Sequence, residues 1–498
     1  MGTNKGLTYR RQFILGCNYV EKLENWKRTP LKNGLNLTSH PDLELTQVEC
    51  NGIELTLLGF FIDPYNPKRS NQDNLECILD GANSFDDVLK NTYSYSGRWV
   101  IIYNDPKESK VFNDPCGMRQ VYYTIKDKKI WCGSQPNILA DVLNYKQDTD
   151  SNLVEFISSP NFEKEEKSWF GEGTLFREIK HLMPNKYLNL NNKTTKRYWI
   201  DEESTLSLDE TVVSVCEILK GSLIAIEERY NPMLAVTAGW DSRVLLAASK
   251  SIKENVHYFV STMNTLNPEH MDIKIPNTLL NKLGLKLNVI SNISPLRKEF
   301  KDVLEKNVSM ARDLPKTLTI QHHYDYLGDK ININGNASEI ARMYYGEYHP
   351  ENINTVYLAD ISGYSSCKYV IHSLEKWYLE AKEVSKDHNI DIMDLFYWEQ
   401  RMGNWGTMYQ AEQDIAIEEF CPFNNRKLLM QLLKVDKKYR RSPDYKIYQK
   451  IIRNLWEETL SEPINPVNLK GKVKRVIIKI MPESMKRNLK SLVKSLKK

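Results

Sequence analysis

The segment Asn231–Lys250, NPMLAVTAGWDSRVLLAASK, decides the fold. Its apolar residues Met233–Val236 have the length of a buried parallel strand, and the TAGWDS sequence after them contains small residues suited to a sharp turn. Apolar residues at Val244, Leu245 and Ala248 then recur with the spacing of a helix that lies on a sheet. The segment therefore predicts a strand, a tight turn and a helix, the repeating unit of α/β domains.

The predicted turn has the features of an anion site. A helix that begins directly after a strand points free backbone N–H groups and the positive end of its dipole at one place, where proteins commonly bind phosphate. The hydroxyls of Thr237 and Ser242 add donors, and Asp241 would suit a phosphate that carries Mg²⁺. The residues alone leave two interpretations open: a nucleotide phosphate site, or an ordinary strand-to-helix turn capped by Asp or Ser.

The TAGWDS sequence resembles the SGGxDS pyrophosphate loop of the N-type ATP pyrophosphatases, specifically that of asparagine synthetase and its relatives. The resemblance implies a doubly wound parallel-sheet domain of the adenine nucleotide α-hydrolase-like (PP-loop) type, which binds ATP and Mg²⁺. It implies that Asp241 binds the metal. The residues implied to hold pyrophosphate are Thr237, Ala238, Gly239, Trp240 and Ser242. Thr237 replaces the first serine of the family pattern, and Ala238 replaces its first glycine.

The composition is that of a soluble globular protein. The chain has 498 residues, enough for two or three domains, and 41% of them are hydrophobic and 27% charged. No apolar run reaches about 18 residues, so we expect no transmembrane helix, and the N-terminal sequence lacks the pattern of a signal peptide. The eight cysteines have no CxxC spacing, which argues against a zinc site or disulfide framework and favours a cytoplasmic protein.

Residues 467–498 are predicted to form a basic amphipathic tail. The positive charge of the lysines and arginines in this segment is larger than the net charge of +4 of the whole chain. The rest of the chain is therefore negative overall and gives no reason to expect nucleic-acid binding. Apolar residues recur with helical spacing among these lysines. Two interpretations stay open: contact with an acidic partner or an anionic membrane, which would hold the protein at the inner face of the membrane, and a solvated tail that packs partly on the body.

Residues 1–205 are predicted to form a β-rich domain. Its expected strands are 53–62, 98–103, 120–125 and 129–132, and one helix is expected at Asn74–Leu89. The sequences SGRWVIIY at 96–103 and DPCGMR at 114–119 resemble the glutaminase-type N-terminal domain of asparagine synthetases. This resemblance implies an Ntn-hydrolase-like α+β sandwich of the class II glutamine amidotransferase type.

The nucleophile of that domain type is missing. A working glutaminase of this class uses an N-terminal cysteine that is exposed when Met1 is removed, but residue 2 here is Gly2. The first cysteine, Cys17, follows the apolar residues 13–15 and is predicted to be a small buried hydrophobic residue. We therefore expect a degenerate domain without glutaminase activity, and free ammonia or an amine as the nitrogen donor.

Residues 206–466 alternate between helical and strand patterns, as expected of a doubly wound parallel sheet. Helices are predicted at 211–228, 268–282 and 313–327, and strands at 256–260 and 330–334. The resemblance implies that Val260 and Ser261, at the end of one strand, contact the adenine and ribose of ATP. Asp272, at the start of a predicted helix, is interpreted as a helix N-terminal charge rather than as a catalytic residue.

A second acidic segment, GNASEIAR at 335–342, stands where the synthetases have GEGxDE. In the family this segment supplies a second Mg²⁺ carboxylate and a base for the amine. Glu339 is the acid that remains here, and Ser338 stands near the metal-binding Asp of the family pattern. Either Glu339 shares Mg²⁺ with Asp241 while Arg342 binds a phosphate or carboxylate, or Glu339 and Arg342 simply pair with each other.

A late lysine contacts the phosphates in the synthetases, and residues 444–448, DYKIY, resemble the start of the helix concerned. We take Lys446 as the basic residue nearest the nucleotide. The resemblance thus implies Asp241, Glu339 and Lys446 as catalytic residues, with the metal bound by Asp241 and Glu339.

The resemblance to asparagine synthetase extends over about residues 10–465. It implies that the protein binds ATP with Mg²⁺, adenylates a small-molecule carboxylate and transfers the acyl group to ammonia or an amine, with release of AMP and pyrophosphate. Two alternatives stay open: a non-catalytic ATP-binding or scaffolding relative, and a specialised amide ligase of cell-surface polysaccharide or peptide biosynthesis. The sequence identifies neither the acid nor the amine.

Overall fold

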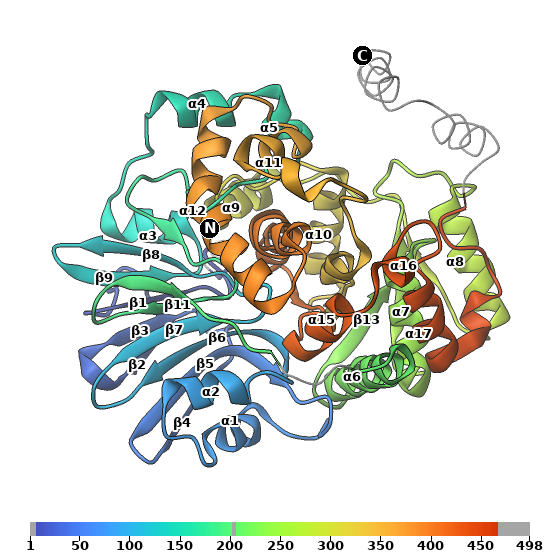
Figure 1. Cartoon of the computed structure of the whole chain (residues 1–498), viewed down its shortest axis with the longest axis horizontal. Coiled ribbons are helices and arrows are strands. Elements are labelled where there is room, and N and C mark those ends of the chain that lie inside the picture. Colours follow the sequence, from blue (N-terminus) through green and yellow to red (C-terminus); the bar gives the residue numbers. More distant parts are fainter. Residues whose placement is uncertain (1–5, 202–205, 467–498) are drawn as a thin grey trace.

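The structure is a computed structural model that describes residues 6–201 and 206–466 (Figure 1). Its N-terminal part contains two six-stranded antiparallel sheets, with strand orders β10-β8-β9-β1-β3-β2 and β12-β11-β7-β6-β5-β4. The strands of the first sheet are β1 (Phe13–Gly16), β2 (Lys27–Pro30), β3 (Asn36–Ser39), β8 (Tyr122–Lys126), β9 (Lys129–Gly133) and β10 (Lys180–His181). Those of the second are β4 (Leu45–Cys50), β5 (Ile53–Ile62), β6 (Ser96–Asn104), β7 (Ser109–Asn113), β11 (Lys186–Asn189) and β12 (Thr194–Arg197).

The two sheets form the inner layers of a four-layer sandwich. One apolar core lies between them, with Leu15 of β1 and Val100 of β6 among its members. On the other face of the second sheet, β5 and β6 pack against α1 (Asn71–Leu79) and α2 (Phe85–Asn91). On the other face of the first sheet, Ile14 packs with Ile138 of α3 (Pro136–Leu143). The order of layers is helix, sheet, sheet, helix.

Two local predictions for this part are wrong. The helix expected at Asn74–Leu89 is two helices, because Gly81 adopts a φ of +71° and Ser84 caps a new helix by accepting a hydrogen bond from the N–H of Asp87. Cys17 is half-buried rather than buried. The apolar residues before it are enclosed in β1, but the strand ends at Gly16, so Cys17 lies outside the core.

The C-terminal part contains a five-stranded parallel sheet in the order β15-β14-β13-β16-β17. Its strands are β13 (Asn231–Ala235), β14 (His257–Ser261), β15 (Asn288–Ile290), β16 (Lys330–Ile333) and β17 (Glu418–Phe420). The chain starts at the central strand, proceeds outward through β14 and β15, and then returns to the other side of β13 as β16. The direction of winding therefore reverses between β13 and β16, the position where open α/β sheets bind ligands.

Helices surround this sheet. Those nearest the reversal are α6 (Leu208–Arg229), α7 (Trp240–Ala248), α8 (Met271–Lys282), the 3₁₀ segment η3 (Asn336–Arg342) and α17 (Lys446–Trp456). The other helices of the C-terminal part are α9 (Lys298–Asn307), α10 (Pro315–Tyr326), α11 (Thr355–Ile361), α12 (Lys368–His388), α13 (Ile392–Leu395), the π-helix Phe396–Gly406, α14 (Thr407–Gln413), α15 (Arg426–Leu433) and α16 (Lys437–Arg440). Two short helices of the N-terminal part, α4 (Ser151–Ile157) and α5 (Pro160–Lys164), do not belong to this set, and α4 packs against α12. Figure 1 shows α6, α7 and α17 side by side, and α17 packs against both of the other two.

Four charged residues join the two parts of the chain, and we call them the interface cluster: Arg98 and Arg119 from the N-terminal part, and Asp414 and Glu418 from the C-terminal part. Arg98 donates to both oxygens of Asp414 at 2.6 and 2.8 Å and to Glu418 at 2.6 Å. Arg119 donates to the other oxygen of Glu418 at 2.9 Å. Both arginine side chains are only 2% exposed, and those of Asp414 and Glu418 are 10% and 18% exposed, so the pairing is largely shielded from solvent.

The mixed α/β class predicted from the sequence is confirmed. The domain boundary predicted at 205/206 touches residues 202–205, and the predicted basic tail covers 467–498; both segments lie outside the described residues. Within the part of the chain that is described, no helix is both long enough and apolar enough to cross a membrane.

Candidate functional site

The loop of residues 237–242, between β13 and α7, is held by its own hydroxyl groups. The hydroxyls of Thr237 and Ser242 share a hydrogen bond of 3.1 Å. The N–H of Thr237 donates to the Ser242 hydroxyl at 3.1 Å, and the N–H of Gly239 donates to the Thr237 hydroxyl at 3.2 Å. Gly239 is the N-cap of α7 and supplies no side-chain cap. The loop is a compact turn at the positive end of a helix dipole.

Asp241, in the first turn of α7, and Glu339, after β16, are joined by one arginine. A single Nη2 atom of Arg342 donates to Asp241 Oδ2 at 3.0 Å and to Glu339 Oε1 at 2.7 Å. The Ser338 hydroxyl donates to the other oxygen of Asp241, and the Tyr397 hydroxyl donates to the other oxygen of Glu339. We call these five residues the site cluster. The pairing of Glu339 with Arg342 considered from the sequence is present, and the shared arginine also brings Glu339 beside Asp241.

A glycine allows the two segments to approach each other. A Cβ atom at Gly335 would lie 2.7 Å from Cβ of Asp241, so any larger residue there would push η3 away from α7. Tyr448 of α17 fixes the segment from the other side by donating to the carbonyl of Ser338 at 2.6 Å. The rings of Tyr445 and Tyr448 lie 5.3 and 5.9 Å from the Arg342 guanidinium. These contacts orient Arg342 toward the two carboxylates.

The site cluster has fewer positive than negative charges. Burial raises the pKa of Asp241; Arg342 opposes that effect, Glu339 reinforces it, and the pKa remains raised. For Arg342, burial lowers the pKa, but Asp241 and the other neighbouring groups outweigh it, so the pKa is raised. The Asp241 and Glu339 side chains are each 33% exposed, against 8% for Arg342. Two carboxylates that share one largely buried guanidinium are therefore partly open to solvent.

Other residues contact the loop. The N–H of Ala238 donates to Asp272 Oδ1 of α8 at 3.1 Å, so a carboxylate occupies one of the N–H groups predicted to bind phosphate. The N–H of Asn465 donates to the carbonyl of Ala238 at 2.8 Å. The buried Arg243 donates to the carbonyls of Thr459 and Glu462 at 2.6 and 2.8 Å. The end of the described chain is thus fastened against the loop.

The remaining predicted site residues occupy different surroundings. Trp240 is buried, with its ring centroid 5.9 Å from that of Tyr445. Val260 is buried in β14, and the half-buried Ser261 shares a hydrogen bond of 2.8 Å with a threonine of α10. Lys446 is exposed at the first residue of α17, and among the described residues it has no hydrogen-bond or ion-pair partner. The two tyrosines beside it contact Arg342, but its own side chain is not part of the site cluster.

Sequence reasoning missed the contributions of Ser338, Tyr397, Tyr448 and Asp272. Asp272 had been interpreted as a helix charge, and it does lie in the first turn of α8, but it also accepts the loop N–H. The spacing of the chain gave no signal for Tyr397 and Tyr448, which come from segments far from the loop. The sign that the sequence offered was the density of aromatic residues around residue 397. In the structure these residues lie on the π-helix Phe396–Gly406, and π-helices are rare and often found at functional sites.

The donor set of the site cluster fits a Mg²⁺ ion that accompanies a nucleotide. Mg²⁺ in nucleotide sites takes one or two protein carboxylates and completes its octahedral shell with phosphate and water oxygens. Asp241 and Glu339 supply two carboxylates, and the single guanidinium between them leaves an excess of negative charge. In the described part of the chain, no group of three or more acidic, histidine or cysteine side chains could hold a metal ion. The residues therefore fit a metal ion that is bound partly by these two carboxylates and partly by phosphate oxygens.

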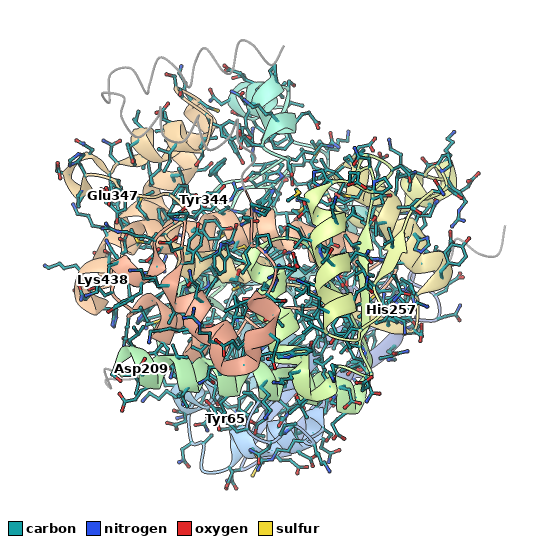
Figure 2. The ribbon with its side chains drawn as sticks, turned by 90° about the vertical axis from the view of Figure 1, so that its right-hand side faces the viewer. Tyr65, Asp209, His257, Tyr344, Glu347 and Lys438 are labelled. Carbon is teal, nitrogen blue, oxygen red and sulfur yellow. The ribbon has the colours of Figure 1, made fainter. Side chains whose placement is uncertain are left out.

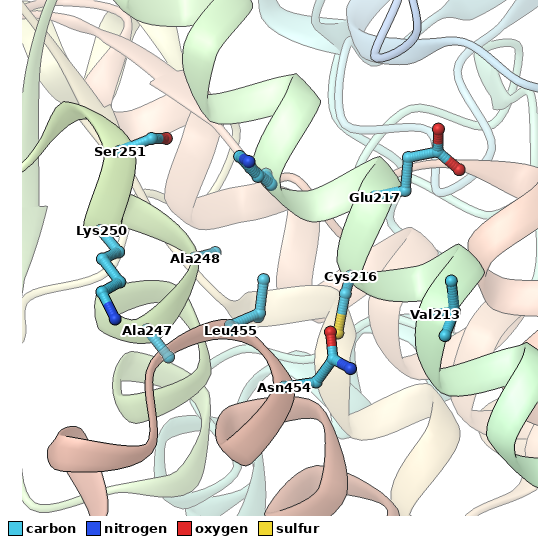
Figure 3. A pocket seen from close by; sticks show the side chains of 10 residues that line it. Val213, Cys216, Glu217, Ala247, Ala248, Lys250, Ser251, Asn454 and Leu455 are labelled. Carbon is cyan, nitrogen blue, oxygen red and sulfur yellow. The ribbon is translucent and has the colours of Figure 1, made fainter.

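A cavity of about 490 Å³ lies elsewhere, between α6, α7 and the end of α17 (Figure 3). It is lined by apolar side chains together with Glu217, Lys220 and Lys250, and contains none of the predicted site residues. Figure 3 shows Glu217 and Lys250 on opposite sides of the cavity, so its polar groups do not converge on one point. We do not assign a ligand to it.

Comparison with known proteins gives only distant structural matches. No protein-family model matches the chain, and no curated protein matches it. One similar structure is the glutamine phosphoribosylpyrophosphate amidotransferase from B. subtilis in complex with ADP and GMP, with 9% identity, a TM-score of 0.24, and coverage of 69% of this chain and 75% of that one. Another, described as the allosteric regulatory enzyme of purine biosynthesis, has 8% identity, a TM-score of 0.25, and coverage of 69% and 73%. Similarity at this level assigns neither a family nor an activity.

Proposed function

We propose that the protein is an ATP-dependent amide ligase with its nucleotide site at the carboxyl ends of β13 and β16. In the reaction, a carboxylate attacks the α-phosphate of ATP, pyrophosphate leaves, and ammonia or an amine then displaces AMP from the acyl-adenylate. The observation that carries this proposal is the convergence of Asp241 and Glu339 at the reversal of the sheet. The resemblance of the 237–242 loop to a pyrophosphate loop supports it.

In this proposal the residues of the chain bind and neutralise phosphate. The first turn of α7 directs its N–H groups and dipole at the pyrophosphate, and Arg342 stabilises charge that develops on it. Asp241 and Glu339 would hold the Mg²⁺ that accompanies ATP, which would neutralise the phosphate oxygens. Val260 and Ser261 stay proposed contacts of the adenosine, and Lys446 a proposed phosphate contact. Tyr397 positions Glu339 through its hydrogen bond.

A specific observation favours a second candidate, a non-catalytic nucleotide-binding protein. Ser338 stands near the position of a metal-binding Asp in the resembled family, and its hydroxyl donates to Asp241 instead of supplying another carboxylate. Asp272 also occupies the Ala238 N–H. A site with this donor set could bind a nucleotide without activating an acid.

Pyrophosphate release and ATP affinity distinguish the two candidates. The full chain would be incubated with ATP, Mg²⁺, ammonia and a panel of carboxylates, and pyrophosphate would be measured alongside calorimetric ATP titration. The ligase proposal predicts release that depends on one class of acid and falls at least about 100-fold in Asp241→Ala. ATP binding without release from any acid would favour the second candidate. Release unchanged by Asp241→Ala would overturn the site assignment.

A further inference from the structure

One arginine beside the site cluster has no acidic partner among residues 6–201 and 206–466. Arg401 lies on the π-helix Phe396–Gly406, one turn after Tyr397. Its half-buried guanidinium lies 5.0 Å from the ring of Tyr344 and 4.3 Å from the ring of Trp405. Among the described residues it has neither a hydrogen-bond acceptor nor a carboxylate within ion-pair distance, and its Nε is buried without a partner. Buried polar groups without partners are costly and are uncommon in native proteins.

The acids that accept hydrogen bonds from the aromatic residues around Arg401 are already engaged. Glu339 accepts from Arg342 and Tyr397. Glu166, which accepts the indole N–H of Trp405 at 3.1 Å, also pairs with Arg312 at 3.3 Å. Arg401 therefore keeps a full set of donors for a group that the described part of the chain does not supply.

Aromatic side chains connect Arg401 to the site cluster. The ring centroid of Tyr344 lies 4.7 Å from that of Tyr397, the residue that donates to Glu339. Met343 has a φ of +48°, which ends η3 and turns the chain so that Tyr344 follows directly after the segment of Arg342. Tyr344 is 46% exposed, and Figure 2 labels it on the face of the molecule that is turned toward the viewer. An accessible ring thus lies against the tyrosine that holds Glu339.

We propose that Arg401 binds the carboxylate of a ring-bearing acid whose ring lies against Tyr344, and that this acid is the substrate of the neighbouring site. The planar fork of an arginine suits a carboxylate. Its position between two aromatic rings fixes its orientation, and an exposed tyrosine offers a flat surface to an aromatic or a sugar ring. The inference rests on the proposed function for the role of the acid as substrate, but not for its binding.

Small acids test the binding directly. Benzoate and D-glucuronate represent the aromatic and the sugar forms of a ring-bearing acid, benzamide and D-glucuronamide are their neutral counterparts, and acetate is a carboxylate without a ring. Binding to the full chain would be measured by calorimetry and by ligand-observed saturation-transfer NMR. We expect at least one ring acid to bind about tenfold more tightly than its amide, and the stronger of the two identifies the ring type. Equal binding of both acids and their amides would overturn the proposal.

Variants locate the site. Arg401→Gln should lower the affinity for the ring acid about tenfold, with a smaller loss in Arg401→Lys, which keeps the charge but not the fork. Arg177→Gln, which removes an exposed arginine of the N-terminal part, is the matched control and should change nothing. If Arg401→Gln unfolds, Tyr344→Ala alters an exposed residue and should weaken the ring acids but not acetate. Unchanged affinity in a folded Arg401→Gln protein, or in Tyr344→Ala, would overturn the assignment.

ATP titration of the same samples separates this inference from the proposed function. If the protein binds ATP and its affinity for the acid does not depend on Arg401, the assignment of the acid site is wrong and that of the nucleotide site is retained. Acid binding that depends on Arg401, in a protein that binds no ATP, would support the acid site and overturn the ligase proposal.

Discussion

The interface cluster and the site cluster are built from the same kinds of side chain but have opposite charge balance. At the interface, Asp414 and Glu418 share Arg98 and Arg119. Burial raises the pKa of Glu418, but Arg119, Arg98 and Arg11 outweigh that effect, so the pKa is lowered. At the site, two carboxylates share Arg342, and the pKa of Asp241 stays raised. A largely enclosed cluster whose arginines fully compensate its carboxylates holds the structure together, whereas an open cluster short of positive charge can accept a cation with its ligand.

The largest effect is expected when the closed cluster is broken. Arg98→Gln would remove three charge-assisted hydrogen bonds, two of them to the buried Asp414, so we expect a loss of about 3–5 kcal/mol in the free energy of unfolding. Denaturant unfolding followed by tryptophan fluorescence would measure it. Arg177→Gln, at an arginine that is 69% exposed, serves as the control and should leave the stability nearly unchanged.

An arginine-to-glutamine substitution in the site cluster tests whether the two clusters differ as described. Arg342→Gln should destabilise the protein clearly less than Arg98→Gln does, because Asp241 and Glu339 are each one-third exposed and water can solvate them. Its ATP affinity, measured by calorimetry, should fall instead. If both variants lost the same stability, the distinction between a closed and an open cluster would be wrong.

The stability contributed by a residue next to the interface cluster should depend on pH. Glu419, next to Glu418 in β17, is fully buried and accepts from the amides of Asn332 and Asn334. Burial raises the pKa of Glu419 to about 8, from an ordinary value of 4.5. The folded protein therefore binds the proton that the unfolded chain has released between these values, and stability falls as the pH rises from about 4.5 to 8.

Glu419→Gln should remove this dependence, since the amide keeps an acceptor and carries no charge. The variant should gain on the order of 2–3 kcal/mol relative to the natural chain between pH 6 and pH 8. Parallel unfolding curves at the two pH values would measure the gain. A difference in stability that stays constant with pH would show that Glu419 is ionised throughout.

The sequence predicted those parts of the site that are local in the chain. The strand, turn and helix around Asp241 follow from apolar spacing, and Gly335 and Glu339 from one short segment after β16. Tyr397 and Tyr448 could not be found in this way, because their contacts depend on how distant helices pack. The split of the helix expected at 74–89 shows the same limit at short range, since a single Gly81 with positive φ outweighed the helical pattern.

A smaller effect, on ATP affinity, is expected from Asp272, which places a negative charge beside the 237–242 loop. Asp272→Asn should tighten ATP binding several-fold, because it removes a carboxylate that holds the Ala238 N–H and repels phosphate. The gain is limited because the side chain is 40% exposed and therefore screened by solvent. Calorimetric titration with ATP would measure it. Weaker binding in this variant would mean that Asp272 positions the loop rather than competing with the ligand.

The smallest effect should come from an ion pair that belongs to neither cluster. Arg297 donates to both oxygens of Asp325 at 2.7 and 3.0 Å, a better geometry than the single Arg342 atom offers to its two acids, but its side chain is 49% exposed. Arg297→Gln should change the free energy of unfolding by less than about 1 kcal/mol. A loss as large as that of Arg98→Gln would mean that hydrogen-bond geometry, and not enclosure, determines which charged pairs hold this protein together.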